Sequence, residues 1–194
     1  MLTHGAGAGC NSDFMQQLVA ALDAQNIAVS LFNFSYMRQA QATGVKRPPA
    51  KMPVLLQELE AELAQIAKAS SAGFPLFIGG KSMGGRVASM LQSSNVKAIF
   101  AFSYPFHPPG KSQWRTAHFD TLNRPLFIMQ GERDPFGQRA ELAELSWPQV
   151  RLKWLATGDH DFKPTKASGL TQQQLISAAA TYCSEMIDEI LLAS

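Results

Sequence analysis

A short glycine-rich string carries the side chain best suited to chemistry in this sequence. Gly80-Lys81-Ser82-Met83-Gly84 follows an apolar run that begins at Leu76 and precedes residues with helical spacing. A serine in the pattern G-x-S-x-G between a strand and a helix is typical of a nucleophile elbow, a strained turn that projects the hydroxyl outward. Glycine at Gly80 and Gly84 leaves room across that turn. The pattern predicts Ser82 as the nucleophile of an acyl transfer.

A serine hydroxyl is a weak nucleophile until a neighbouring base takes its proton, so this prediction requires a histidine. In strand-turn-helix hydrolases the chain order is serine, acid, histidine, which places the base late in the sequence. His107 and His118 lie too early, before the candidate acid Asp134. His160 lies in the loop after the last apolar run and is the predicted base.

The acid must hold the imidazole in one tautomer and stabilise it once it is charged. Asp134 lies in the segment after the apolar run Leu126–Gln130 and is the preferred candidate. Glu132 lies close enough to be an alternative. Asp120, which would follow an earlier strand, is a more distant alternative.

Acyl transfer also requires backbone N–H groups aimed at the developing oxyanion, each worth about 3 to 4 kcal/mol. The segment His4-Gly5-Ala6-Gly7-Ala8-Gly9 follows the first short apolar run. We expect the backbone N–H groups of Ala6 and Met83 to form the oxyanion hole. His4 is expected to shape this loop, and His4 and Gly5 are predicted to border the substrate.

These residues need a scaffold that brings the ends of several strands together. Short apolar runs alternate with longer segments of helical period, which is typical of βαβ units. Runs that are apolar at successive positions would be apolar on both faces of a sheet, which predicts buried parallel strands. The alternating pattern of Val150–Leu155 predicts an edge strand. The expected fold is a doubly wound, mostly parallel α/β sheet of about six strands with helices on both faces. The predicted strands are Met1–Thr3, Ile27–Phe34, Leu76–Ile78, Val96–Phe102, Leu126–Gln130 and Val150–Leu155.

Two helices have clear boundaries in the sequence. A helix over about Pro53 to Lys68 begins with proline in its first turn and has one apolar face. The last helix begins where Thr171 and Gln174 have capping-box spacing, and its apolar stripe is expected to cover the sheet.

Composition limits the remaining function classes. The 194 residues are 46% hydrophobic, which predicts one domain over residues 1–194 with a well-buried core. A net charge of +2 without a basic run argues against nucleic acid as a partner. Cys10 and Cys183 match neither a disulfide framework nor a metal site, so we expect reduced thiols and no metal or cofactor. Without a signal-like start or a long apolar span, we expect a cytoplasmic protein that does not bind membranes.

Four segments give the sequence a family resemblance, and the pair Asp159 and His160 adds to it. Together they resemble the compact predicted α/β-hydrolases of the KANL/TEX type, which are distantly related to dienelactone hydrolases. The resemblance implies the α/β-hydrolase fold and the triad of Ser82, Asp134 and His160. Relatives usually have an additional strand or hairpin before the oxyanion loop, so we expect a very short first strand here. The four segments are HGAGAG from His4, GGKSMGGR from Gly79, SYPFHPPGK from Ser103 and QGERDPFG from Gln130.

The segment from about 103 to 123 lies where hydrolases of this fold insert lids. It is too short for a large cap, so we expect a minimal lid and an open site for a small or exposed ester. Tyr104 and His107 in this segment are predicted to border the acyl pocket. Lys81 is predicted to border the substrate as part of a positive rim, although a solvated surface charge is an alternative.

The sequence leaves some alternatives to a carboxylesterase-like hydrolase open and argues against others. Gly80-Lys81-Ser82 mimics the end of a nucleotide-binding P-loop, but Pro75 stands where that motif needs glycine. A non-catalytic interaction module that keeps this fold is a second alternative, because fold alone does not prove activity. Thioesters and peptides use the same triad as small esters, and the oligomeric state is left open.

Overall fold

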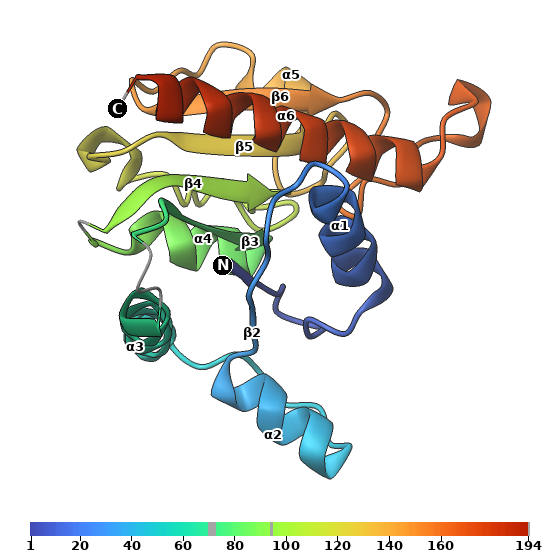
Figure 1. The fold of residues 1–194 in the computed structure, drawn as a ribbon. Coiled ribbons are helices and arrows are strands. Elements are labelled where there is room, and N and C mark those ends of the chain that lie inside the picture. Colours follow the sequence, from blue (N-terminus) through green and yellow to red (C-terminus); the bar gives the residue numbers. More distant parts are fainter. Residues whose placement is uncertain (70–72, 94, 194) are drawn as a thin grey trace.

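The computed structural model of the chain describes residues 1–69, 73–93 and 95–193. In this part of the chain the strands form one six-stranded sheet with the order β2-β1-β3-β4-β5-β6, and every neighbouring pair is parallel (Figure 1). The chain runs outward in one direction from β1 to β2 and in the other from β3 to β6. A ligand crevice is therefore expected beyond the carboxyl ends of β1 and β3. The strands are β1 Leu2–Thr3, β2 Leu31–Phe32, β3 Leu76–Lys81, β4 Val96–Phe102, β5 Leu126–Gly131 and β6 Val150–Leu155.

Helices cover both faces of the sheet, which confirms the predicted fold class. Helices α1 and α6 pack against each other on one face, and α3 and α4 lie on the other (Figure 1). Two 3-10 turns, Phe119–Thr121 and Lys166–Ser168, lie in connecting segments. The α-helices are α1 Asp13–Asp23, α2 Ser35–Thr43, α3 Met52–Ala69, α4 Met83–Met90, α5 Arg139–Leu142 and α6 Gln172–Leu192.

Strand β4 shows why the central strands are apolar on both sides. Ala98, Phe100 and Phe102 pack with α1 and α6, whereas Ile99 and Ala101 pack with α3 and α4. Successive side chains of a strand point to opposite faces, so a strand covered on both sides has no polar face. This double burial holds the ends of β3, β4 and β5 in fixed relative positions.

The structure confirms several predicted elements. Strands β4 and β6 have the predicted bounds, and β6 is an edge strand. At the start of α6, Thr171 and Gln174 form the predicted capping box. The prediction of a strand over Ile27–Phe34 is wrong in length, because β2 contains only Leu31–Phe32. Its partner β1 is itself two residues long, so the residues before Leu31 have little ladder to join.

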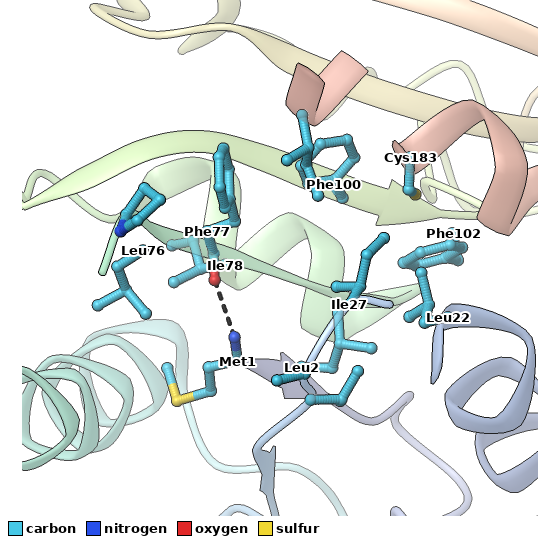
Figure 2. A pocket seen from close by; sticks show the side chains of 14 residues that line it. Met1, Leu2, Leu22, Ile27, Leu76, Phe77, Ile78, Phe100, Phe102 and Cys183 are labelled. Carbon is cyan, nitrogen blue, oxygen red and sulfur yellow. Dashed lines mark hydrogen bonds between the residues drawn. The ribbon is translucent and has the colours of Figure 1, made fainter. Parts of the chain in front are cut away.

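An apolar pocket of about 110 Å³ lies between the sheet and the helices α1 and α6 (Figure 2). Its labelled lining includes Leu22 of α1, Phe100 of β4 and Cys183 of α6. Figure 2 also shows the hydrogen bond of 2.8 Å from the Met1 amino group to the Phe77 carbonyl oxygen, which fixes the start of β1 against β3. The pocket lies beside the first residues of β1 and β3, and none of the predicted site residues is in its lining.

Candidate active site

The turn between β3 and α4 places Ser82 in a strained backbone conformation. Ser82 has φ 51° and ψ −112°, outside the regions that most residues with a side chain adopt. Its N–H donates to the Phe102 carbonyl oxygen at 2.9 Å, so the neighbouring strand supports the turn. A side chain at either Gly80 or Gly84 would collide with Thr3 of β1. These two glycines therefore allow β1, β3 and α4 to approach each other closely enough to form the elbow.

The structure brings the three predicted triad side chains together. His160 Nε2 lies 2.9 Å from Ser82 Oγ, and His160 Nδ1 lies 2.8 Å from Asp134 Oδ2. Because a carboxylate accepts hydrogen bonds, the ring proton lies on Nδ1, and Nε2 is left to accept the serine proton. This is the tautomer that a general base requires. Asp134 is fully buried, and the imidazole is 21% exposed.

Two further donors hold the Asp134 carboxylate in place. The Phe136 backbone N–H donates to Oδ1 at 2.9 Å, and Gln130 Nε2 donates to Oδ2 at 3.0 Å. Gln130 is itself fully buried in β5. A glutamine in an otherwise apolar strand, four residues before an aspartate, is a sequence signal for such a contact that our prediction missed.

The alternative acids do not take the place of Asp134. Glu132 Oε2 accepts from the Thr157 backbone N–H at 2.9 Å, and Oε1 pairs with Arg139. These contacts hold the pKa of Glu132 below its usual value, the Thr157 N–H contributing most. Asp120 lies exposed in the 3-10 turn Phe119–Thr121. Of the three candidates, Asp134 is the carboxylate bonded to His160.

Loop geometry after β6 brings His160 to the elbow. The absence of a side chain at Gly131 lets the carbonyl groups of Gly158 and Asp159 pass close to the end of β5. Asp159 Oδ1 accepts from the backbone N–H groups of Asp161 and Lys163 at 2.8 and 2.9 Å. This aspartate therefore shapes the loop. The Phe136 ring lies 4.4 Å from the imidazole, centre to centre, and covers one side of it.

The orientation of the Gly5–Ala6 peptide group follows from the hydrogen bonds of His4. His4 Nε2 accepts from the Phe34 backbone N–H at 3.1 Å, so its ring proton lies on Nδ1. Nδ1 donates to the Gly5 carbonyl oxygen at 2.6 Å. In a trans peptide the following N–H points opposite to that carbonyl. The Ala6 N–H is thus directed away from His4.

Burial supports this arrangement of His4. The side chain is fully buried, and desolvation lowers the pKa of His4 below its usual value, so the neutral ring is favoured. His4 therefore shapes the loop as expected. The structure does not bear out its predicted contact with substrate, because the ring is enclosed between Phe34 and Tyr36.

Tyr36 of α2 connects the two predicted oxyanion donors, and the sequence prediction missed it. Its hydroxyl donates to the Ala6 carbonyl oxygen at 3.0 Å and lies 3.9 Å from Met83 Sδ. Burial raises the pKa of Tyr36, so the hydroxyl stays protonated and can donate. Met83 begins α4, where the first backbone N–H groups have no acceptor within the helix.

A cleft of about 590 Å³ opens beside the triad. One wall is the glycine-rich loop, the second is the start of α1, and the third is the loop that carries His160. Lysine and aspartate side chains lie among a few apolar ones. The lining residues are Gly5, Ala6, Gly7, Ala8, Ser12, Asp13, Phe14, Met15, Gln17, Lys81, Ser82, Phe136, His160, Asp161, Lys163 and Gln172.

The segment 103–123 does not border this cleft, which corrects two predictions. Tyr104 is fully buried, its ring packs on Phe106 and Phe119, and its hydroxyl donates to the Arg115 carbonyl oxygen at 2.9 Å. His107 is 5% exposed and packs against Trp114. Tyr104 packs in the core, and His107 lines a different pocket together with Trp114, so neither Tyr104 nor His107 borders the cleft beside the triad.

Lys81 also differs from its prediction as a rim charge. Its side chain is 7% exposed, and its ammonium points into the protein toward the His160 loop. The lysine reaches the cleft lining but is not a solvated surface charge.

The described residues offer no obvious place for a metal ion. Within 1–69, 73–93 and 95–193, no group of three or more His, Cys, Asp or Glu side chains is arranged to hold one. Cys10 and Cys183 are buried free thiols. No helix among the described residues has both the length and the apolar character needed to cross a bilayer.

Solved structures resemble this fold over nearly its whole length. An alpha-beta serine hydrolase homologue from Coxiella burnetii has a TM-score of 0.67 at 15% identity, covering 93% of this chain and 83% of its own. Est1E from Butyrivibrio proteoclasticus has a TM-score of 0.65 at 13% identity, covering 98% and 87%. A putative hydrolase of the alpha/beta superfamily from Xanthomonas campestris pv. campestris has a TM-score of 0.58 at 18% identity, covering 97% and 96%. At these identities the likeness establishes the fold alone.

Sequence comparisons identify the family. A search of curated proteins finds no match. The family model described as "Alpha/beta hydrolase domain" matches residues 1–188, which include the glycine-rich loop, the elbow and the His160 loop. The chain therefore belongs to the alpha/beta hydrolase domain family.

Proposed function

We propose that this protein is a serine hydrolase that cleaves a small ester by transferring the acyl group to water. The observation that carries the proposal is the unbroken hydrogen-bonded path from Ser82 Oγ through His160 to the buried Asp134 carboxylate. This path ends in a cleft at the point where the strand order reverses, the place where doubly wound sheets bind ligands.

In the first half of the proposed reaction, Ser82 Oγ attacks the ester carbonyl while His160 Nε2 takes the serine proton. The backbone N–H groups of Ala6 and Met83 stabilise the oxyanion of the tetrahedral intermediate. The intermediate collapses to an acyl-serine, and the imidazolium gives its proton to the departing alcohol. Asp134 stabilises the charged ring throughout.

The second half repeats these steps with water as the nucleophile. His160 takes a proton from water, the resulting hydroxide attacks the acyl-serine, and the second intermediate collapses. The carboxylic acid leaves, and the proton returns from His160 to Ser82 Oγ. No group beyond the triad and the two backbone donors is needed to balance the protons.

Cleft shape supports a short acyl group. The cleft is open and bordered by charged side chains, including Asp13 and Lys163, and the segment 103–123 does not cover it. Because the cleft is open and charged side chains border it, a long alkyl chain would stay partly in contact with water, so we place the preferred substrates among small esters of the carboxylesterase class, EC 3.1.

The proposal is more specific than the family assignment in three respects: the group within the family, the partner and the substrate class. The GGKSMGGR and YPFHPPGK strings favour membership of the compact KANL/TEX-type group within the family. The partner is a small acyl compound rather than a nucleic acid or a membrane. Thioesters and peptides remain alternative substrates of the same triad, while an interaction module would leave all of them uncleaved.

A panel of p-nitrophenyl esters with acyl chains from acetyl to decanoyl tests this function. We expect kcat/KM to be highest for the shortest chains, and the Ser82→Ala variant to lose activity by at least about 10³-fold. Ser112→Ala, a change at an exposed serine, serves as the matched control with wild-type rates. No turnover of any ester or thioester by folded wild type would refute the proposal, and a preference for decanoyl would refute the short-chain assignment.

A further inference from the structure

The residue immediately before the proposed nucleophile is a buried lysine. Lys81 is the last residue of β3, and only 6% of it is exposed. Its ammonium nitrogen lies 5.1 Å from the centre of the Phe14 ring of α1. From there Nζ donates a hydrogen bond of 2.6 Å to the backbone carbonyl oxygen of His160.

Two adjacent residues of the elbow therefore contact the same residue of a distant loop. Ser82 Oγ meets the His160 imidazole at 2.9 Å, and Lys81 Nζ meets the His160 main chain at 2.6 Å. The first contact is the one through which the proposed proton transfer runs. The second joins the end of β3 to the backbone that carries the imidazole, so it limits how far this backbone can move from the elbow.

Charges around Lys81 explain how a cation is kept in this buried position. Its Nζ lies 3.4 Å from Asp161 Oδ1, in the same loop as His160. Burial lowers the pKa of Lys81 below its usual value, and the carboxylates of Asp161, Asp134 and Asp159 oppose that change. A buried cation is costly unless it is paired and hydrogen-bonded. The His160 carbonyl oxygen accepts the hydrogen bond of Lys81, and Asp161 supplies the opposite charge. Both belong to the loop that carries the His160 imidazole.

We propose that Lys81 is a positioning residue that holds the His160 loop at the distance from β3 at which the imidazole spans Ser82 and Asp134. This inference rests on the proposed serine-hydrolase function. Lys81 acts through His160 and does not itself touch the reacting atoms. A cation at the cleft could instead bind substrate. Loss of a positioning residue lowers kcat, whereas loss of a substrate-binding residue raises KM.

The principal variant is Lys81→Met, which keeps an unbranched side chain against Phe14 and removes the ammonium. We expect kcat for a short p-nitrophenyl ester to fall roughly 10- to 100-fold with KM within about twofold, because misplacing a catalytic group by about 1 Å costs rates of this order. Lys81→Arg keeps a cation with N–H donors and should turn over faster than Lys81→Met.

Lys153→Met is the matched control. Lys153 is also a strand lysine whose ammonium lies near an aromatic ring, 5.4 Å from the centre of Tyr182, but it lies on β6 in an exposed position. We expect wild-type kcat and KM from it. A Lys81→Met variant with wild-type kcat, or with a raised KM and unchanged kcat, would overturn the positioning role, as would an arginine variant no faster than Lys81→Met.

A second measurement separates failure of this inference from failure of the proposed function. In ¹⁵N-histidine NMR spectra, wild type should show His160 as one ordered Nδ1–H tautomer, and Lys81→Met should show that signal broadened or averaged. If wild type cleaves no ester, the proposed function fails, and these spectra still decide whether Lys81 orders His160: an unchanged His160 signal overturns the inference. If Lys81→Met does not fold, Lys81→Gln is compared in the same two assays.

Discussion

Gln130 Nε2 and His160 Nδ1 donate to the same oxygen of Asp134, at 3.0 and 2.8 Å. The glutamine amide also lies 3.2 Å from the Gly137 carbonyl oxygen, so it connects the end of β5 to the turn that carries the acid. Gln130 thus fixes the direction in which the carboxylate faces the imidazole.

Gln130→Met is expected to lower kcat about tenfold, because it removes a hydrogen bond to a buried carboxylate at nearly constant side-chain volume. A bond to a charged group is worth about 1.5 to 3 kcal/mol, so a loss in the free energy of unfolding of about this size should accompany it. Steady-state ester hydrolysis and urea unfolding measure the two effects. Gln149→Met, at an exposed glutamine before β6, is the control, and equal rates for the two variants would contradict the role of Gln130.

Asp134→Asn is expected to keep the fold and lower kcat by about 10³- to 10⁴-fold. An amide at this position can present an N–H to the imidazole, which favours the tautomer with its proton on Nε2. That nitrogen then cannot accept the proton of Ser82. Ester turnover combined with circular dichroism tests this expectation, and near-wild-type turnover would show that another group serves as the acid.

His4→Phe is expected to lower kcat by about tenfold or more while leaving KM nearly unchanged. Phenylalanine retains the ring contacts with Phe34 and Tyr36 but cannot donate to the Gly5 carbonyl oxygen, so the Ala6 N–H loses its fixed direction. One misdirected oxyanion donor costs up to about 3 to 4 kcal/mol in the transition state. Assays below the melting temperature of the variant check this, and an unchanged kcat would show that His4 does not orient the loop.

The lowered pKa of His118 predicts that the folded protein loses stability at acidic pH. Burial, aided by the charge of Arg86, lowers the pKa of His118 to about 4 from an ordinary value of 6.5. Between these values the unfolded chain binds a proton that the folded protein does not, so stability falls as the pH drops from about 6.5 toward 4.

His118→Gln removes this titration while retaining an N–H donor for Ser89, which lies 2.8 Å from His118 Nε2. Between pH 7 and pH 5, the free energy of unfolding of wild type should fall by about 1 kcal/mol more than that of the variant. This figure is reduced because the ring is partly exposed. Urea unfolding at both pH values gives this difference. An identical pH dependence for the two proteins would contradict the assignment.

Sequence patterns predicted the features that depend on local chemistry. Strands β4 and β6, the capping box of α6 and the glycines beside Ser82 each follow from short-range rules of burial, hydrogen bonding and steric space. The positions of Ser82, Asp134 and His160 after different predicted strands indicated that these side chains could meet, because parallel strands gather their carboxyl ends at one edge, although Glu132 and Asp120 stayed open as alternative acids.

The errors concern residues whose surroundings come from distant parts of the chain. Tyr104 and His107 were expected at the cleft because their segment follows β4, but three-dimensional packing buries both away from it. Lys81 was expected at the surface because lysine usually lies there, whereas a loop 79 positions later provides its partners. Tyr36 was missed because its contact with Ala6 joins segments 30 positions apart, whereas Gln130 had a local signal, a polar residue in an apolar strand four residues before Asp134.

The central claim, that Ser82 is the nucleophile, is tested most directly by mapping where a fluorophosphonate reacts. Trypsin cleavage after Lys81 and Arg86 would release Ser82–Arg86, a peptide in which Ser82 is the hydroxyl-bearing residue. Mass spectrometry should find the phosphonyl adduct on this peptide in wild type and no adduct in His160→Ala under the same conditions. An adduct on a different peptide, or folded wild type that stays unmodified, would contradict the account.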